Sequence, residues 1–311
     1  MEFGLMTEPQ LGMTYQEQLD AARFAEAQGL AVFARSDHYG FPGFEAPHAT
    51  DAFAALAGLA RDTTSIALCV LVSPITFRHP GVIAKTAATI DEMSGGRMIL
   101  GVGTGWMEHE HEMLGLEFPE SSERFARLEE SLAYIRAAIG KAPGGFSGEY
   151  YTLTDEAILP GPTGSMPIIV GGGGPRRTPR LAGTFADEYN VFSMGPDGTR
   201  ERVERAREAA EAAGRDPGDL LISMMGGGVV GSDQASYRAA LERAAAAHPF
   251  GRTPEQIEER LREAGAPVGT ADEAAEAVAR LSEAGVERYY LQVLGAIDTD
   301  HLAEQFAVLQ G

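Results

Sequence analysis

The sequence is poor in cysteine, in basic residues and in long apolar runs. Its single cysteine, Cys69, excludes a disulfide framework and a cysteine metal cluster, and its apolar neighbours predict a buried thiol. With 25 Lys+Arg against 45 Asp+Glu the formal net charge is −20, which disfavours nucleic acid and anionic membrane surfaces as partners. No apolar run approaches the ~20 residues of a membrane span, and the first residues lack the pattern of a signal peptide. We therefore expect a cytoplasmic protein that acts on a small molecule.

Short β-type runs alternate with amphipathic helical segments along the 311 residues. Strands separated by helices predict right-handed βαβ units and a parallel sheet, and eight such units favour a closed (β/α)8 TIM barrel over an open sheet. We expect one domain, residues 1–311. A clear helical face is formed by Phe125, Leu128, Leu132, Ile135 and Ile139. The predicted strands are residues 2–6, 30–35, 66–72, 97–103, 167–171, 188–192, 220–225 and 287–293.

Two segments exceed a minimal barrel. Residues 144–159, after the fourth predicted strand, have the pattern of a small hairpin. Residues 226–267, after the seventh, hold a glycine run and two predicted helices, 234–247 and 254–264. Long insertions at that end of a barrel usually cover the active site or line the substrate pocket, and we expect this of residues 226–267. The sequence leaves open whether five residues in or next to this segment belong to the pocket wall or to the core. They are Met224, Met225, Tyr237, His248 and Phe250.

Two of the predicted strands end abruptly in glycines. An apolar run with this ending is typical of a buried parallel strand whose carboxyl end opens into a loop near a ligand. After the second run, Pro175 suits the first turn of a helix with free N–H groups, an anion site to which Arg176 or Arg177 can add charge. These ends suggest a phosphate-bearing cofactor, although tight turns without a ligand are the alternative. The residues are Gly103, Thr104 and Gly105 after the fourth strand and Gly171, Gly172, Gly173 and Gly174 after the fifth.

Two further polar motifs are candidates for chemistry. Asp37 and His38 follow the second predicted strand directly, where a barrel places catalytic or binding groups, although a local cap is the alternative. Residues 108–112, Glu-His-Glu-His-Glu, offer two imidazoles and carboxylates to a metal. Hydrolase barrels with His-x-His carry it on the first strand, which here has none at residues 3–6. We therefore expect no metal there and interpret residues 108–112 as an acidic, solvated helix start.

Five blocks of the sequence, in their order and spacing, resemble the bacterial luciferase-like monooxygenase superfamily. Within it the chain is similar to the actinobacterial oxidoreductases that use the deazaflavin coenzyme F420. The blocks span nearly the whole chain except residues 226–267, and they are residues 25–38, 71–80, 85–105, 168–190 and 268–293. The resemblance implies a (β/α)8 barrel, a phosphorylated cofactor and a homodimer. It also implies that residues 171–174 hold the cofactor phosphate, and that residues 103–105 approach the same cofactor from the neighbouring strand.

The resemblance assigns roles to further residues. The aspartate that matches Asp37 lies beside the deazaflavin ring in relatives, and the histidine that matches His38 faces the substrate. We therefore expect Asp37 to contact the cofactor and His38 to donate a proton or polarise the substrate. In many relatives the corner that matches Leu71, Val72 and Ser73 carries a non-prolyl cis peptide behind the ring. The resemblance places this bond between Leu71 and Val72.

Trp106 is a departure from the sugar-phosphate dehydrogenases of this superfamily, in which a glutamate at this place serves as general acid. An indole cannot usefully donate a proton, so that reaction is disfavoured here. We expect Trp106 to stack near the cofactor ring or to wall the pocket. Among the nearby histidines, His111 matches a family position near the pocket and His109 does not.

The resemblance thus implies an oxidoreductase that transfers a hydride between coenzyme F420 and a small organic substrate. An FMN-dependent monooxygenase is the first alternative, because both cofactors carry a phosphate on the same side chain. For the polyglutamate tail of F420 this acidic chain offers only scattered arginines, among them Arg176, Arg177 and Arg180. A catalytically silent barrel or partner subunit is the second alternative, and a metal-dependent hydrolase is the third.

Overall fold

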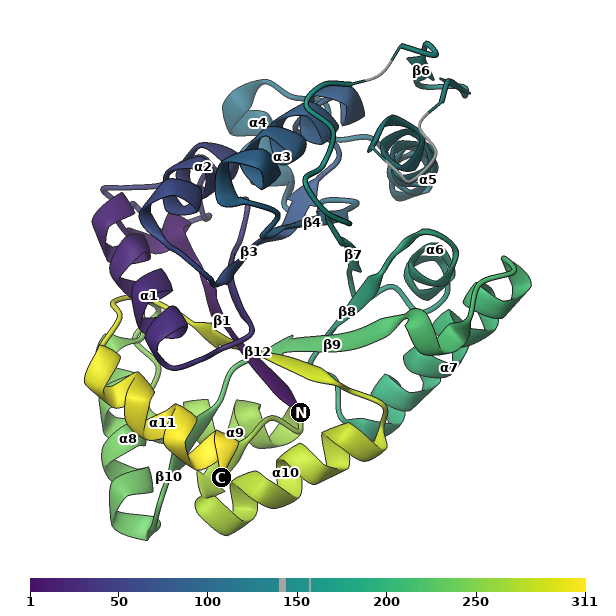
Figure 1. The fold of residues 1–311 in the computed structure, drawn as a ribbon. Helices are drawn as coiled ribbons and strands as arrows, with labels where there is room; N and C mark the ends of the chain where they lie inside the picture. The colour runs from purple at the N-terminus through teal and green to yellow at the C-terminus, as the bar shows by residue number, and fades with distance from the viewer. Residues whose placement is uncertain (140–143, 157) are drawn as a thin grey trace.

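The computed structural model describes residues 1–139, 144–156 and 158–311. Parallel strands close into a barrel in the order β1-β12-β9-β8-β7-β4-β3-β2, and helices cover its outside (Figure 1). Each predicted strand is confirmed, with ends that shift by at most two residues. The barrel strands are β1 Glu2–Thr7, β2 Val32–Arg35, β3 Ala67–Pro74, β4 Met98–Gly103, β7 Ile168–Gly171, β8 Glu188–Phe192, β9 Leu221–Gly226 and β12 Arg288–Val293.

The helices pack on the barrel through apolar faces of helical period. In α5 (Ser121–Ile139), Leu128, Leu132, Ile135 and Ile139 are buried as predicted, and Phe125 is partly buried. Two 3-10 turns, η1 Pro9–Leu11 and η2 Pro217–Asp219, complete the connections. The other outer helices are α1 Tyr15–Ala27, α2 Ala52–Asp62, α3 Pro80–Ser94, α4 Glu108–Leu114, α6 Arg177–Phe185, α7 Pro196–Ala212, α10 Ala271–Glu283 and α11 Thr299–Gln310.

The inside of the barrel is an apolar core of its own. Cys69 is a buried free thiol there, as its sequence context predicts, and it packs with Leu71, Ile99 and Ile169. Towards the amino ends of the strands, the Arg288 guanidinium pairs with Glu188 at 2.5 Å, and the Tyr290 hydroxyl donates to the same carboxylate at 2.9 Å. These charges satisfy one another within the amino end of the barrel, as buried charges require.

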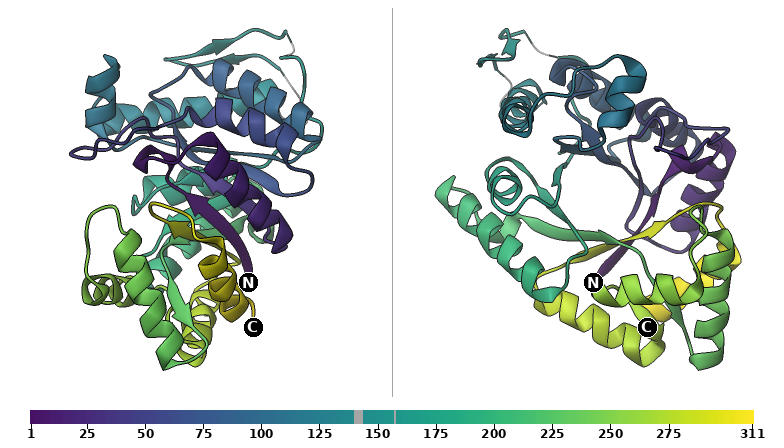
Figure 2. Two further views of the ribbon diagram at one scale, coloured as in Figure 1. Left: turned by 90° about the vertical axis from the view of Figure 1, so that its left-hand side faces the viewer. Right: turned by 180° about the vertical axis from the view of Figure 1, so that it is seen from behind.

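Both predicted additions to the barrel are present. The hairpin consists of β5 Phe146–Ser147 and β6 Thr152–Leu153, paired antiparallel. After β9, the chain forms β10 Val229–Gly231, α8 Gln234–Ala247, α9 Pro254–Glu263 and β11 Val268–Thr270, and β10 pairs with β11 apart from the barrel. The hairpin and the α8–α9 segment lie at opposite sides of the barrel (Figures 1 and 2). Within the described residues, no helix has both the length and the apolar character that a membrane crossing requires.

Candidate functional site

The structure brings the predicted site residues to one face of the barrel. Asp37 and His38 follow β2, Ser73 lies near the end of β3, residues 103–106 end and follow β4, and residues 171–174 end and follow β7. Parallel strands present their carboxyl ends together, and this face carries the active sites of such barrels. The polar and glycine-rich motifs are therefore neighbours in space although they are far apart in the sequence.

The floor of this face is formed around Val72. The Leu71–Val72 peptide bond is cis, as the resemblance implies, and the pairing of β3 with β4 shifts register between Val70 and Ser73. A Cβ added to Gly101 would lie 2.8 Å from the Val72 side chain, and one added to Gly103 or Gly171 would lie 2.9 Å from it. Gly103 and Gly171 thus make room for this valine. The sequence analysis instead explains these glycines by a close approach of the backbone to a ligand.

Asp37 is held in a buried ion pair. Its Oδ2 accepts hydrogen bonds from the Ser73 hydroxyl at 2.7 Å and from the Arg78 guanidinium at 2.6 Å, and only 1% of its side chain is exposed. Arg78 also pairs with Asp51 and lies over the Phe53 ring at 4.9 Å. The expected contact between Asp37 and a cofactor stays a prediction. In the structure, Asp37 fixes the start of the loop that carries His38.

His38 is paired with a carboxylate from α4. Its Nδ1 lies 2.7 Å from Oε1 of Glu110, whose Oε2 accepts the Tyr39 backbone N–H at 2.5 Å. The His38 side chain is 16% exposed, and its ring makes a T-shaped contact with the Trp106 indole, with 5.7 Å between the ring centroids. Burial would lower the pKa of His38, but the hydrogen bond and charge of Glu110 outweigh it and raise that pKa above its ordinary value. Nε2 makes no hydrogen bond within the described residues.

The interpretation of residues 108–112 as a solvated helix start is wrong for two of them. Glu110 and His111 are each 1% exposed, because α4 turns this side towards the barrel. His111 lies between the Thr76 hydroxyl, 2.7 Å from Nε2, and the Met107 carbonyl, 2.9 Å from Nδ1. Among the residues that the structure describes, no group of three or more His, Cys, Asp or Glu side chains could hold a metal ion.

The glycine loop leads into an uncapped helix. α6 begins at Arg177, so Pro175 precedes the helix, where we expected it in the first turn, and the N-cap residue Arg176 makes no side-chain cap. Gly172 has a φ of 149°, and a Cβ on Gly174 would lie 2.6 Å from the Thr178 hydroxyl. Backbone N–H groups at such a start favour an anion. The side chains of Arg176 and Arg177 are exposed.

Sequence reasoning missed Glu110 and Arg78, the partners of His38 and Asp37. Each partner lies about 40 or more residues away, with separations of 72 for His38–Glu110 and 41 for Asp37–Arg78. A signal for Glu110 was present, because Met107, Glu110 and His111 follow the spacing of one helix face, and an acidic residue on a buried face requires a partner.

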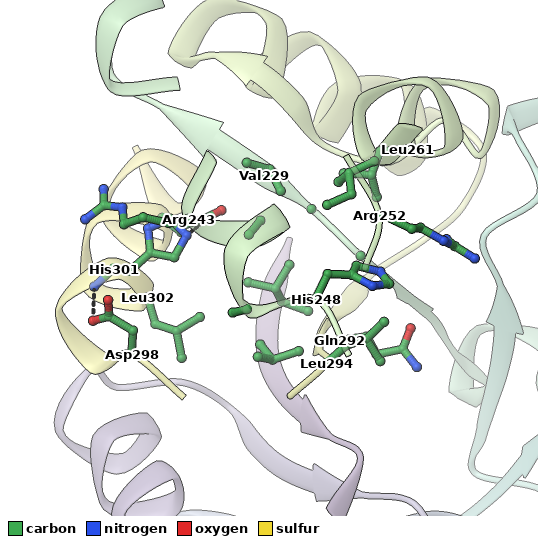
Figure 3. A pocket seen from close by; sticks show the side chains of 18 of the residues that line it. Val229, Arg243, His248, Arg252, Leu261, Gln292, Leu294, Asp298, His301 and Leu302 are labelled. Atoms are coloured by element: carbon green, nitrogen blue, oxygen red, sulfur yellow. Dashed lines mark hydrogen bonds between the residues drawn. The ribbon is translucent and has the colours of Figure 1, made fainter. Parts of the chain in front are cut away.

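A cavity lies between the segment after β9, the end of β12 and α11 (Figure 3). Its volume is about 730 Å³. His248 and Phe250 line it, whereas Met224 and Tyr237 are buried in the core. For these four residues the structure thus decides between cavity wall and core.

A chain of hydrogen bonds joins the cavity to the loop before His38. The Gln292 amide, on the cavity wall, donates to Oε1 of Glu8 at 2.5 Å. The other oxygen of Glu8 accepts the Gln10 amide at 2.7 Å, and Gln10 accepts the Ser36 hydroxyl at 2.7 Å. The chain of hydrogen bonds thus runs from the cavity wall to Ser36, two residues before His38.

Comparison with known proteins identifies a family for nearly the whole chain. The model of the luciferase-like monooxygenase family matches residues 1–288. An F420-dependent glucose-6-phosphate dehydrogenase of Microbacterium testaceum is 36% identical over 208 residues, which are 66% of this chain and 61% of that protein. One of Kineococcus radiotolerans is 38% identical over 204 residues, 65% of this chain and 60% of that protein. The chain thus spans about three fifths of the length of these curated relatives.

Solved structures extend the likeness over the full chain. An F420-dependent secondary alcohol dehydrogenase in complex with an F420-acetone adduct has a TM-score of 0.76 at 21% identity, covering 99% of this chain and 96% of that one. Monooxygenase RslO1 from Streptomyces bottropensis has a TM-score of 0.79 at 22% identity, covering 100% and 97%. At these identities the likeness shows the fold.

Proposed function

The chain belongs to the luciferase-like monooxygenase family, and we propose that it is an oxidoreductase that transfers a hydride between coenzyme F420 and a small organic substrate. The observation that carries the proposal is the His38–Glu110 pair, which lies on the same barrel face as an uncapped glycine loop. The F420-dependent dehydrogenases at 36% and 38% identity support F420 over FMN.

The residues present fit a phosphorylated deazaflavin. The loop at residues 171–174 ends at a helix start without a side-chain cap, where backbone N–H groups favour an anion. Gly172, Gly173 and Gly174 would hold the phosphate, and Val72 offers an apolar surface to the ring. When bound, coenzyme F420 supplies or accepts a hydride in a two-electron step.

The chain's own contribution is proton transfer and orientation. Glu110 holds Nδ1 of His38 and favours the charged imidazole, which leaves Nε2 to donate a proton to a substrate oxygen. In the reducing direction, a carbonyl carbon receives the hydride and its oxygen receives this proton, so that an alcohol forms. The Trp106 indole, which is 62% exposed and lies beside His38, would form one wall of that site.

We do not propose glucose 6-phosphate, the substrate in the names of these dehydrogenases, as the substrate of this chain. The residue after Gly105 is Trp106, and its indole supplies no proton where the resemblance expects a general acid. We therefore propose ketones, alcohols and conjugated enones as the substrate class, with His38 as the acid.

A side-by-side titration of the protein with coenzyme F420 and with FMN tests the cofactor, with ligand fluorescence and absorbance as readouts. We expect F420 to bind more tightly. Preference for FMN would make the protein a monooxygenase, and binding of neither would favour the silent barrel.

The variant Gly173→Val tests the phosphate site. A Cβ at Gly173 meets only the ring of the half-exposed Phe192, at 3.3 Å, so the fold tolerates it better than a ligand does. We expect F420 affinity to fall about 100-fold, a loss of about 2.7 kcal/mol. Gly164→Val is the control, because nothing lies within 4 Å of a Cβ there. Unchanged affinity in Gly173→Val would place the phosphate elsewhere.

The homodimer and the cytoplasmic location stay predictions. Sedimentation equilibrium of the purified protein checks the first, with a mass of twice 33.0 kDa expected for a dimer. Cell fractionation checks the second.

A further inference from the structure

We infer that the cavity beside β9 and β12 binds the anionic headgroup of the substrate, an apolar molecule that carries a carboxylate or a phosphate. The inference rests on the proposed function in treating the ligand as a substrate. It is carried by two arginines, Arg252 and Arg260, which lie beside His248 at one side of the cavity, and we call these three residues the cationic wall.

Much of the rest of the cavity lining is aliphatic. At about 730 Å³ it falls in the range of small-molecule sites, roughly 300–1,000 Å³. Aliphatic side chains from five elements or loops line it: Val229, Ile257, Leu261, Leu291, Leu294 and Leu302. A ligand can therefore bury a hydrocarbon body here, with the unpaired arginines at one side of the cavity and Arg243, already paired with Glu304, at the other.

The cationic wall has no carboxylate partner. Arg252 and Arg260 form no ion pair within the described residues, whereas Arg243, which lines the same cavity, pairs with Glu304 at 2.6 Å. Figure 3 shows His248, Arg252 and Gln292 on one side and Arg243, His301 and Asp298 on the other. Asp298, the carboxylate on the lining, accepts the His301 backbone N–H at 3.0 Å and so caps α11.

The two arginines of the wall repel each other and disfavour a charge on His248. Burial and then the charges of Arg252 and Arg260 lower the pKa of His248. Burial and then Arg260 lower the pKa of Arg252. In a chain of net charge −20, cations gathered without a counter-charge are the exception, and a bound anion relieves their repulsion.

The position of the cavity suits a substrate. Phe250, on its lining, packs against Phe41 at 5.2 Å and Phe44 at 6.0 Å between ring centroids, and both belong to the loop that follows His38. On another side, Gln292 leads through Glu8 to the loop before His38. A ligand with its headgroup at the cationic wall extends from there towards the His38–Glu110 pair.

Binding to the full chain without cofactor tests the inference. The probes are octanoate and octyl phosphate, which distinguish the two headgroups, with octanamide as the neutral match, measured by isothermal titration calorimetry. We expect at least one anion to bind about tenfold or more tightly than octanamide, the effect of one charge-assisted contact. Arg252→Gln and Arg260→Gln should each reduce this preference, and Arg243→Gln, which removes the paired arginine, should leave it intact.

Equal binding of octanamide and the anions, or a preference that survives in the double variant Arg252→Gln/Arg260→Gln, would overturn the inference. A second titration of the same variants with coenzyme F420 locates the cofactor's acidic tail. If the variants lose F420 affinity while octyl anions bind them normally, the wall serves the cofactor and the inference is wrong. If F420 fails to bind the unaltered protein while the anion preference is present, the proposed function fails and the anion site stands.

Discussion

Two regions at the mouth of the barrel hold charge in opposite ways. At the ends of β2 and β3, Asp37 is paired with Arg78, and His38 is paired with Glu110. At the ends of β9 and β12, the arginines of the cationic wall face one another without a carboxylate. Fully paired charges fix side-chain geometry before any ligand arrives, as chemistry requires. Unpaired cations instead leave their counter-charge to a ligand.

The two regions also differ in burial. The carboxylates of Asp37 and Glu110 are each 1% exposed, so removing their partners leaves a buried charge unpaired and lowers the stability of the fold. Arg260 is exposed and keeps its hydration. The first region should therefore be coupled to the stability of the fold, and the second should not.

The largest expected effect separates the regions by stability. Asp37→Asn leaves the partly buried Arg78 guanidinium with one carboxylate fewer, and we expect the free energy of unfolding to fall by about 3 kcal/mol, the lower end for a broken buried pair because Asp51 still contacts Arg78. Arg260→Gln removes an exposed cation, and we expect a change within about 0.5 kcal/mol. Urea unfolding of both variants measures the difference. Equal losses would remove the distinction between the regions.

The next effect separates chemistry from binding. His38→Asn removes the proton donor but leaves the glycine loop intact, so kcat should fall about 100-fold, within the usual contribution of a general acid, with the Kd of F420 unchanged. His109→Asn is the matched control, because this exposed histidine lies on the same helix as Glu110. Steady-state kinetics with a cofactor titration measures both quantities. A loss of F420 affinity at constant kcat would make His38 a binding residue.

Local patterns in the sequence predict the barrel well. Each strand is a short apolar run between helical segments, and this information lies within a few residues, so all eight strands and both additions could be placed. The glycine ends located the functional face for the same reason. The reason for Gly103 and Gly171 could not be found locally, because the valine that they accommodate comes from a different strand.

The sequence does not reveal which charged side chains from distant segments pair with one another. Nothing near His38 points to Glu110, and nothing near Asp37 points to Arg78, since each pair is made only when separate strands and helices meet. The cationic wall is hidden for a further reason. His248, Arg252 and Arg260 fall in residues 226–267, which the family resemblance does not cover, and their common cavity depends on α8, α9 and α11 packing together.

The smallest expected effect concerns pH. Glu110 raises the pKa of His38, so the protonated imidazole persists to higher pH than in a free histidine, and kcat/KM for carbonyl reduction should decline as pH rises through that raised pKa. In Glu110→Gln the carboxylate is gone and burial dominates, so the pKa of His38 falls and the alkaline limb of the pH profile moves to lower pH. Glu112→Gln, an exposed change on the same helix, should leave the limb in place. A limb that stays put in Glu110→Gln would show that another group donates the proton, and the paired region would then be structural alone.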